Sequence, residues 1–103
     1  MDSLGMNSEI QGKIADGLRA GDHKARLLLY EIYATHIRRR VALLTGGDSM
    51  EVADIVQETF LAANRMSDRL DLQSGSLWDW LWGIARRQML RHNRKNTARP
   101  AFV

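Results

Sequence analysis

Residues 49–66 read SMEVADIVQETFLAANRM, and this stretch decides the fold of the chain. On a helical wheel at about 100° per residue it divides into two faces. One face is an apolar stripe made of Val52, Ile55, Val56, Thr59, Phe60, Ala63 and Met66. The opposite face holds Asp54, Gln57, Glu58, Leu61 and Arg65. The stretch is therefore predicted to be an amphipathic helix, and Asp48 and Glu51 have the spacing of a capping box at its start.

The same helical periodicity continues on both sides of this stretch. It predicts an all-α fold, a compact bundle of four helices over about 8–20, 22–46, 49–66 and 76–95. Gly21 is expected to end the first helix, whose apolar positions are Ile10, Ile14 and Leu18. The second helix is expected to start at Asp22 and to end at Gly46, with an apolar set of Ala25, Leu28, Leu29, Ile32, Tyr33, Ile37, Val41 and Leu44. Ser76 and Asp79 mark the start of the fourth, after a predicted loop over residues 67–75.

The composition excludes several classes of protein. The 103 residues suffice for one domain, and the absence of cysteine excludes a disulfide scaffold or a cysteine-based zinc site. The three histidines are scattered, and neither a nucleophile–base pair nor a glycine-rich phosphate loop is visible. We therefore expect no enzyme activity, no cofactor and no metal. The chain starts without a leader pattern and has no apolar run of about 20 residues, so a cytoplasmic location without a membrane span is expected.

The polar face of 49–66 has two interpretations. It is either a solvated helix surface or a place where another protein docks. Leu61 favours docking, because it lies in the middle of this face, surrounded by Asp54, Gln57 and Glu58. An apolar side chain ringed by carboxylate and amide groups is typical of an interaction patch, although one exposed leucine alone is common.

The predicted fourth helix carries the strongest charge segregation. Its apolar stripe is Leu77, Leu81, Ile84, Ala85 and Gln88, widened by Trp78, Trp82 and Met89, and its far side holds Trp80, Gly83, Arg87, Arg91 and Arg94. Residues 86–99 contain no acidic residue but include Arg86, Arg87, Arg91, Arg94, Lys95 and Arg99. Such a surface suits phosphate contact and base stacking. Alternatively, all three tryptophans belong to the core and the arginines keep the helix soluble. The basic triplet at 38–40 is open to the same two interpretations.

At this point two motifs and an upstream pattern resemble one family. The stretch Asp54-Ile55-Val56-Gln57-Glu58-Thr59-Phe60-Leu61 resembles the D-L-V-Q-E-V-F-L signature of sigma factor region 2.2. The stretch Trp80-Leu81-Trp82-Gly83-Ile84-Ala85-Arg86 resembles the W-L-x-x-I-A-R signature of regions 2.3 and 2.4. Upstream, the pattern from Gly21 to Val41 is similar to the start of region 2.1. The chain thus resembles region 2 of the extracytoplasmic-function (ECF) type of the sigma-70 family, over about residues 20–97.

The resemblance implies a function in starting transcription. Asp54, Gln57, Glu58 and Leu61 would bind a coiled coil of the RNA polymerase β′ subunit. The loop would capture a flipped base of the promoter's minus-ten element, with Leu70, Asp71, Gln73, Ser74 and Ser76 as the DNA-binding candidates. The fourth helix would follow the non-template strand through Trp80, Arg86, Arg87, Arg91, Arg94 and Lys95. At positions 87 and 91 the family usually has Asn and Asp, so this helix is more basic than the family pattern.

The resemblance also predicts the domain limits and leaves alternatives open. Residues 1–97 are expected to form the region 2 domain, and residues 98–103 the start of a linker or a disordered tail, with region 4 absent. An anti-sigma factor is a further possible partner. One alternative is a diverged region 2 that binds polymerase or an anti-sigma factor without melting promoters. The other is a helix-turn-helix regulator of duplex DNA, which ranks last because no short helix-turn-helix with a glycine turn is recognised in the sequence.

Overall fold

The computed structural model describes residues 8–72 and 75–98, with the backbone alone described for residues 94–98. It contains four α-helices, α1 (Ser8–Arg19), α2 (His23–Thr45), α3 (Ser49–Met66) and α4 (Leu77–Ala98), and a 3₁₀ helix, η2 (Ser67–Arg69). Within these described ranges there is no strand. The predicted all-α fold of four helices is confirmed, and α3 has the predicted limits.

The helix starts are fixed by polar side chains, as the sequence predicts. The carboxylate of Asp48 accepts hydrogen bonds from the backbone N–H groups of Met50 and Glu51. At the start of α4 the bonding is reciprocal: the Asp79 N–H donates to Ser76 Oγ over 3.1 Å, and the Ser76 N–H donates to Asp79 Oδ2 over 3.2 Å. This is a complete capping box, and it fixes where the loop ends and α4 begins.

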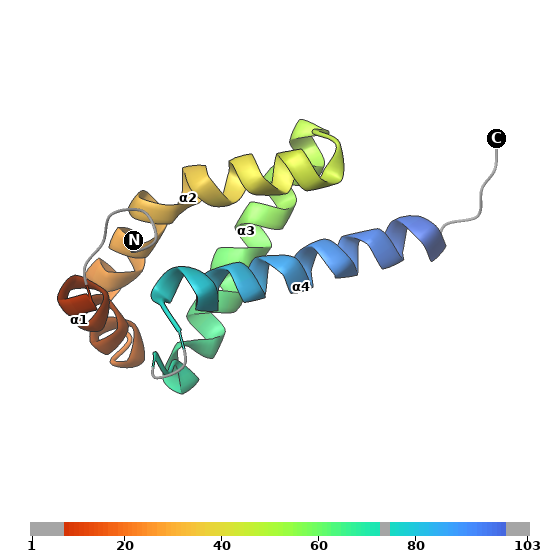
Figure 1. Ribbon diagram of the computed structural model, residues 1–103. Helices are drawn as coiled ribbons and strands as arrows, with labels where there is room; N and C mark the ends of the chain where they lie inside the picture. Colours follow the sequence, from red (N-terminus) through yellow and green to blue (C-terminus); the bar gives the residue numbers. More distant parts are fainter. Residues whose placement is uncertain (1–7, 73–74, 99–103) are drawn as a thin grey trace.

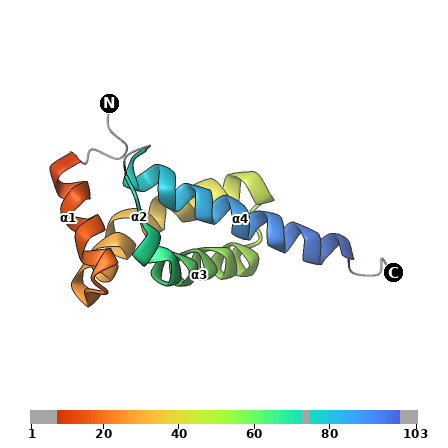
Figure 2. The same ribbon diagram turned by 90° about the horizontal axis from the view of Figure 1, so that it is seen from below.

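The helix α3 is the central element of the fold. It lies between α2 and α4 and contacts both, while α1 packs on α2 and against η2 (Figure 1). The C-terminal part of α4 extends beyond the ends of α2 and α3, and this is visible in both views (Figures 1 and 2). The C-terminal end of the α4 backbone therefore projects from the other helices as an arm (Figures 1 and 2).

One apolar core joins all four helices. The side chains of Leu29, Tyr33, Ile55 and Leu81 are fully buried in it, and the predicted stripes of α3 and α4 face it. Thr59 is also buried, and its hydroxyl donates to the carbonyl of Ile55 over 2.7 Å. That bond satisfies the only polar group of this side chain, so Thr59 is accepted inside an apolar stripe.

Three of the apolar residues that follow the predicted periodicity lie outside the core. Ile10 and Leu28 are about half exposed, and Leu44 is largely exposed. In α1 the buried residues are Gln11, Ile14, Ala15 and Leu18, and Ile10 lies about a quarter turn from the centre of this stripe. Leucines occur on several faces of α2, so spacing alone could not separate the buried ones from the exposed ones.

The segment 67–75 is more ordered than a simple loop. Its first three residues form η2, and the Ser67 hydroxyl donates to the carbonyl of Ala63 over 2.7 Å. The Leu70 side chain is 3% exposed and belongs to the core, and Leu72 packs against the core. The segment is therefore anchored by apolar burial at its start, and Leu70 is buried where a surface position was expected.

A tight glycine turn joins α1 to α2. Gly21 has a φ of 75°, a left-handed conformation that glycine adopts without strain, and the Asp22 N–H donates to the carbonyl of Gly17 over 2.8 Å. Gly21 therefore both ends α1, as expected, and forms the turn into α2, a long helix of 23 residues.

Two glycines in α1 provide a matched test of how closely α1 and α2 pack. A Cβ added at Gly17 would lie 2.6 Å from the Cβ of Ala25, whereas a Cβ added at Gly12 meets nothing within 4 Å. Gly17→Ala is expected to destabilise the domain by about 1–3 kcal/mol, because two backbone-attached carbons must move apart. Gly12→Ala is expected to stabilise it by up to about 1 kcal/mol through helix propensity. Urea unfolding of both variants measures this; changes of the same sign would contradict the close approach.

Candidate functional site

The outer face of α3 carries the four residues predicted to bind polymerase. Asp54, Gln57, Glu58 and Leu61 are all exposed, on the side of α3 opposite its buried stripe. The Leu61 side chain keeps 45% of its surface accessible although it is apolar. We call these four residues the α3 face. It combines two carboxylates, an amide and one leucine on a rigid helix, which suits recognition of a basic and partly apolar partner.

Two adjoining hollows between α2 and α3 form a groove that borders the α3 face. Tyr30, Phe60 and Asn64 line both hollows, while Leu61 lines the first and Leu27 the second. The rings of Tyr30 and Phe60 meet edge to face with centroids 5.0 Å apart. Tyr30 and Leu27 remain 46% and 48% exposed, so they continue the apolar surface of Leu61 onto α2.

Sequence reasoning missed the contribution of α2 to this surface. Leu27 and Tyr30 are three residues apart on a helix and lie outside its buried stripe, which was the available signal. An exposed apolar pair next to Leu61 would have pointed to a docking surface shared by both helices.

Two side chains of α1 bond the backbone at the two ends of the segment before α4. The Arg19 Nη1 donates to the Leu70 carbonyl over 2.8 Å, and the Leu77 N–H donates to Gln11 Oε1 over 2.8 Å. Between these two points Asp71 and Gly75 are exposed, and Ser76 is partly buried. Of the other candidates in this segment, Gln73 and Ser74 lie outside the described residues. Leu70 is buried, so its side chain does not face solvent where DNA would lie.

Two of the three tryptophans form a stack between α2 and α4. The rings of Trp78 and Trp82 are nearly parallel, at 11°, with centroids 5.9 Å apart. Tyr33 continues the stack from α2, at 5.8 Å from Trp78, and the guanidinium of Arg40 lies 4.7 Å from the Trp82 ring centroid. These contacts assign Trp78, Trp82 and Arg40 a packing role that joins the two helices.

Trp80 lies outside that stack. On a helical wheel Trp80, Arg87 and Arg91 fall within about 40° of one another, on the other flank of α4. Trp80 is partly buried against the core, whereas Arg87 and Arg91 are exposed, as is Arg86. The predicted shared face of one tryptophan and several arginines is therefore present, but the tryptophan offers only part of its ring.

The remaining basic candidates are Arg94 and Lys95, which continue along α4 where only the backbone is described. The described part of the chain holds no group of three or more metal-ligating side chains. In that same part, no helix is both long and apolar enough to cross a membrane.

The comparison with family models identifies the fold and its family. The model of sigma-70 region 2 matches residues 29–99, which is more than half of the chain. The chain belongs to the sigma-70 region 2 family. This sigma region 2 domain therefore has a role in RNA polymerase-dependent transcription, in a family of non-enzymatic transcription factors whose partners are the polymerase core and promoter DNA. A search of curated proteins gave no match. The matched residues begin within α2, so α1 lies outside them.

The two faces of α3 should differ sharply in their effect on stability. Ile55 is fully buried, and Ile55→Ala is expected to cost about 2–5 kcal/mol of unfolding free energy. Leu61→Asp changes a half-exposed side chain and is expected to cost about 1 kcal/mol or less. Thermal or urea unfolding followed by circular dichroism measures both. A cost for Leu61→Asp as large as that for Ile55→Ala would show that Leu61 supports the core.

Proposed function

We propose that this domain is region 2 of an ECF-type sigma factor, which docks on the coiled coil of the polymerase β′ subunit and captures the melted minus-ten element. The observation that carries the proposal is the exposed α3 face, where a family signature coincides with solvent-accessible side chains. The place of action is the cytoplasm, where polymerase and promoter meet. An anti-sigma factor is a further partner that such a surface could accept.

Docking is assigned to the α3 face, together with the groove on its α2 side. Leu61, Tyr30 and Leu27 supply apolar area at the centre, and Asp54 and Glu58 supply charge around it. This arrangement follows the usual anatomy of an interface, with an apolar centre and a polar rim. The partner surface is expected to carry basic groups opposite the two carboxylates.

DNA binding is assigned to the segment before α4 and to the basic flank of α4. Arg86, Arg87 and Arg91 are exposed, and no acidic residue occurs among residues 86–99. Arg94 and Lys95 would extend this basic path along the projecting end of the helix. Neutralising phosphates releases bound counterions, which favours binding and makes it depend on salt. Trp80 is the tryptophan proposed to meet a base.

The segment 71–76 is proposed to receive a flipped base, through Asp71, Gln73, Ser74 and Ser76. Its hydroxyl, amide and carboxylate groups can bond the edge of a base, and the exposed Gly75 leaves room for its approach. Because its side chain is buried, Leu70 is given a different role, which is to anchor the segment. Melting then follows from binding a single strand better than the duplex.

A second candidate is a region 2 domain that binds polymerase or an anti-sigma factor without melting promoters. The tryptophan stack favours it, because Trp78 and Trp82 are used in packing and only Trp80 remains for a base. A duplex-reading helix-turn-helix protein is a weaker candidate. The glycine turn after α1 would support it, but the family match and the tertiary roles of α1 and α2 do not.

One probe comparison separates these candidates. The domain is titrated with a single-stranded minus-ten oligonucleotide, the matching duplex and a β′ coiled-coil fragment. The proposed function requires binding to β′ and tighter binding to the single strand than to the duplex. Binding to β′ without any DNA binding would support the interaction module, and equal or tighter binding to duplex would exclude the single-strand mechanism.

Glu58→Lys and Leu61→Asp are expected to weaken binding to a β′ coiled-coil fragment by about tenfold or more. The first places a positive charge opposite the partner's basic groups, and the second buries a charge in the apolar centre of the proposed interface. Binding is measured by calorimetry or a pull-down with purified components. Glu9→Lys is the matched control, since Glu9 is an exposed carboxylate on α1, away from α3. An affinity unchanged by Glu58→Lys and Leu61→Asp would refute the docking assignment.

The combined variant Arg87→Ala, Arg91→Ala is expected to reduce the salt dependence of single-strand binding. Each phosphate neutralised contributes about 0.7 to the slope of log K against log salt for single strands, so the slope should fall by about 1.4. Lys13→Ala removes an exposed cation from α1 and should leave the slope unaltered. A slope retained in the double variant would mean that the two arginines only keep the helix soluble.

A further inference from the structure

Helix α1 lies outside the residues matched by the sigma-70 region 2 model, yet it contacts both ends of the segment before α4. Such contacts join residues that are 51 and 66 positions apart in the chain. Both use a side chain of α1 and a backbone group of the segment. Helix α1 therefore fixes both ends of the segment through backbone groups, whatever side chains the segment carries.

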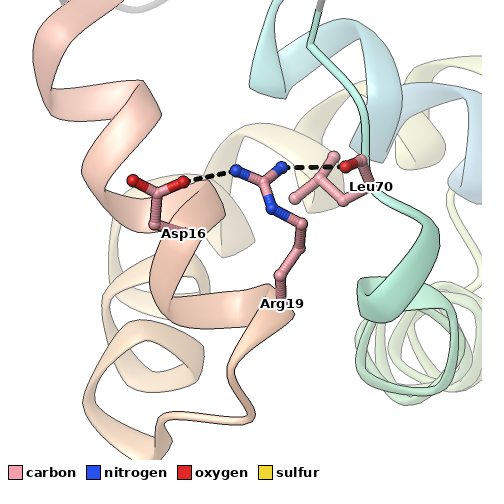
Figure 3. Close-up of polar contacts among 3 residues, drawn as sticks. All are labelled: Asp16, Arg19 and Leu70. Carbon is pink, nitrogen blue, oxygen red and sulfur yellow. Dashed lines mark hydrogen bonds and ion pairs between the residues drawn. The ribbon is translucent and has the colours of Figure 1, made fainter.

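At the start of the segment the partner is Arg19. Its Nη1 donates to the Leu70 carbonyl over 2.8 Å, and its Nη2 is paired with the carboxylate of Asp16 one turn earlier (Figure 3). The two nitrogens of one planar group are thus used at the same time. Asp16 orients the guanidinium, and the guanidinium then holds the backbone of Leu70 while the Leu70 side chain is buried.

At the end of the segment the partner is Gln11. This side chain is 6% exposed, and its Oε1 accepts the N–H of Leu77 over 2.8 Å. Leu77 is the first residue of α4, so its N–H has no acceptor within its own helix. Gln11 supplies that acceptor from another helix and so fixes the point at which α4 begins.

The two α1 side chains lie far enough apart along the helix to reach both ends of the segment. Gln11 and Arg19 are eight residues apart, which is about 12 Å along a helix. Between them Gly12 and Ala15 line a hollow whose other wall is formed by Leu70, Asp71 and Leu72. A Cβ added at Gly12 would meet nothing within 4 Å among the described residues, so this hollow is open beside Gly12. The described contacts hold the segment at its two ends, Leu70 and Leu77.

We propose that Gln11 and Arg19 are positioning residues for base capture, because α1 fixes the two ends, Leu70 and Leu77, between which the base would be received. This inference rests on the proposed function. It adds that specificity for the minus-ten base depends on a helix outside the matched family region, through residues that do not touch the DNA.

The test compares Arg19→Ala and Gln11→Met with Lys13→Ala. Gln11→Met keeps the size of a buried side chain and removes its acceptor, and Lys13→Ala removes an exposed α1 cation that pairs with Glu9 of the same helix. Arg19→Lys keeps one donor and serves as the conservative variant. The first measurement is amide hydrogen exchange at Leu70, Gly75, Ser76 and Leu77, whose N–H groups are hydrogen-bonded. The second is the affinity for single-stranded minus-ten oligonucleotides that differ in one base, and the third is binding to the β′ fragment.

Arg19→Ala and Gln11→Met are expected to speed exchange at these four amides by about tenfold, because one anchoring hydrogen bond is lost in each. The preference for the best base over the others is expected to fall by a similar factor, while binding to β′ is retained. Lys13→Ala should change none of these quantities, and Arg19→Lys should restore part of the base preference.

Three results would overturn the inference. One is unchanged exchange in the segment. Another is faster exchange spread evenly over all four helices, which would mean that the contacts only stabilise the fold. The third is faster exchange in the segment with an unaltered base preference. If the unmodified domain itself shows no preference among bases, the proposed function fails, and the exchange measurement still decides whether α1 holds the segment.

Discussion

The burial of one stripe of α3 between α2 and α4 is the constraint on which the rest of the structure depends. Val52, Ile55 and Val56 form the first half of this stripe, and they are all at least 96% buried. An amphipathic helix that buries one face must expose the other. The position of the α3 face is therefore a direct consequence of core packing, and the side chains proposed to dock on polymerase need no loop to hold them. A site on a rigid helix keeps its geometry before the partner arrives.

The second part of the domain is organised differently. The segment before α4 is anchored at its start by the buried Leu70 side chain and by Leu72, which packs against the core. Hydrogen bonds to Arg19 and Gln11, and the capping box of Ser76 with Asp79, hold its two ends. The docking surface thus rests on apolar burial along a whole helix, and the proposed base-capturing segment rests on two apolar side chains and a few hydrogen bonds. Local opening of the segment is expected to cost much less free energy than unfolding of α3.

The sequence predicts the helices and the two faces of α3 well, because each depends on residues close together in the chain. Capping signals at Asp48 and Ser76 are local, and so is the alternation of buried and exposed positions in α3. The errors concern contacts between distant residues. Gln11 is polar, and its burial is intelligible only once Leu77 is known to lie beside it. Likewise, the packing of Trp82 against Arg40 and the position of Tyr30 in the two hollows that Leu61 and Leu27 also line depend on how α2 crosses its neighbours, which no spacing within one helix reveals.

The tryptophan stack bears on how such a domain could favour a melted strand. Flipping a base costs a few kcal/mol, and stacking on an aromatic side chain returns about 1–3 kcal/mol for each base. Trp78 and Trp82 already stack on each other, and Arg40 covers the second ring, so moving them to a base would break the contact between α2 and α4. Only the partly buried Trp80 can offer a ring without that loss. In the proposed mechanism, stacking alone cannot offset melting, and the difference has to come from phosphate contacts of Arg87 and Arg91 and from hydrogen bonds in the segment 71–76. The arginines that depart from the family pattern therefore lie where this balance of free energies requires additional positive charge.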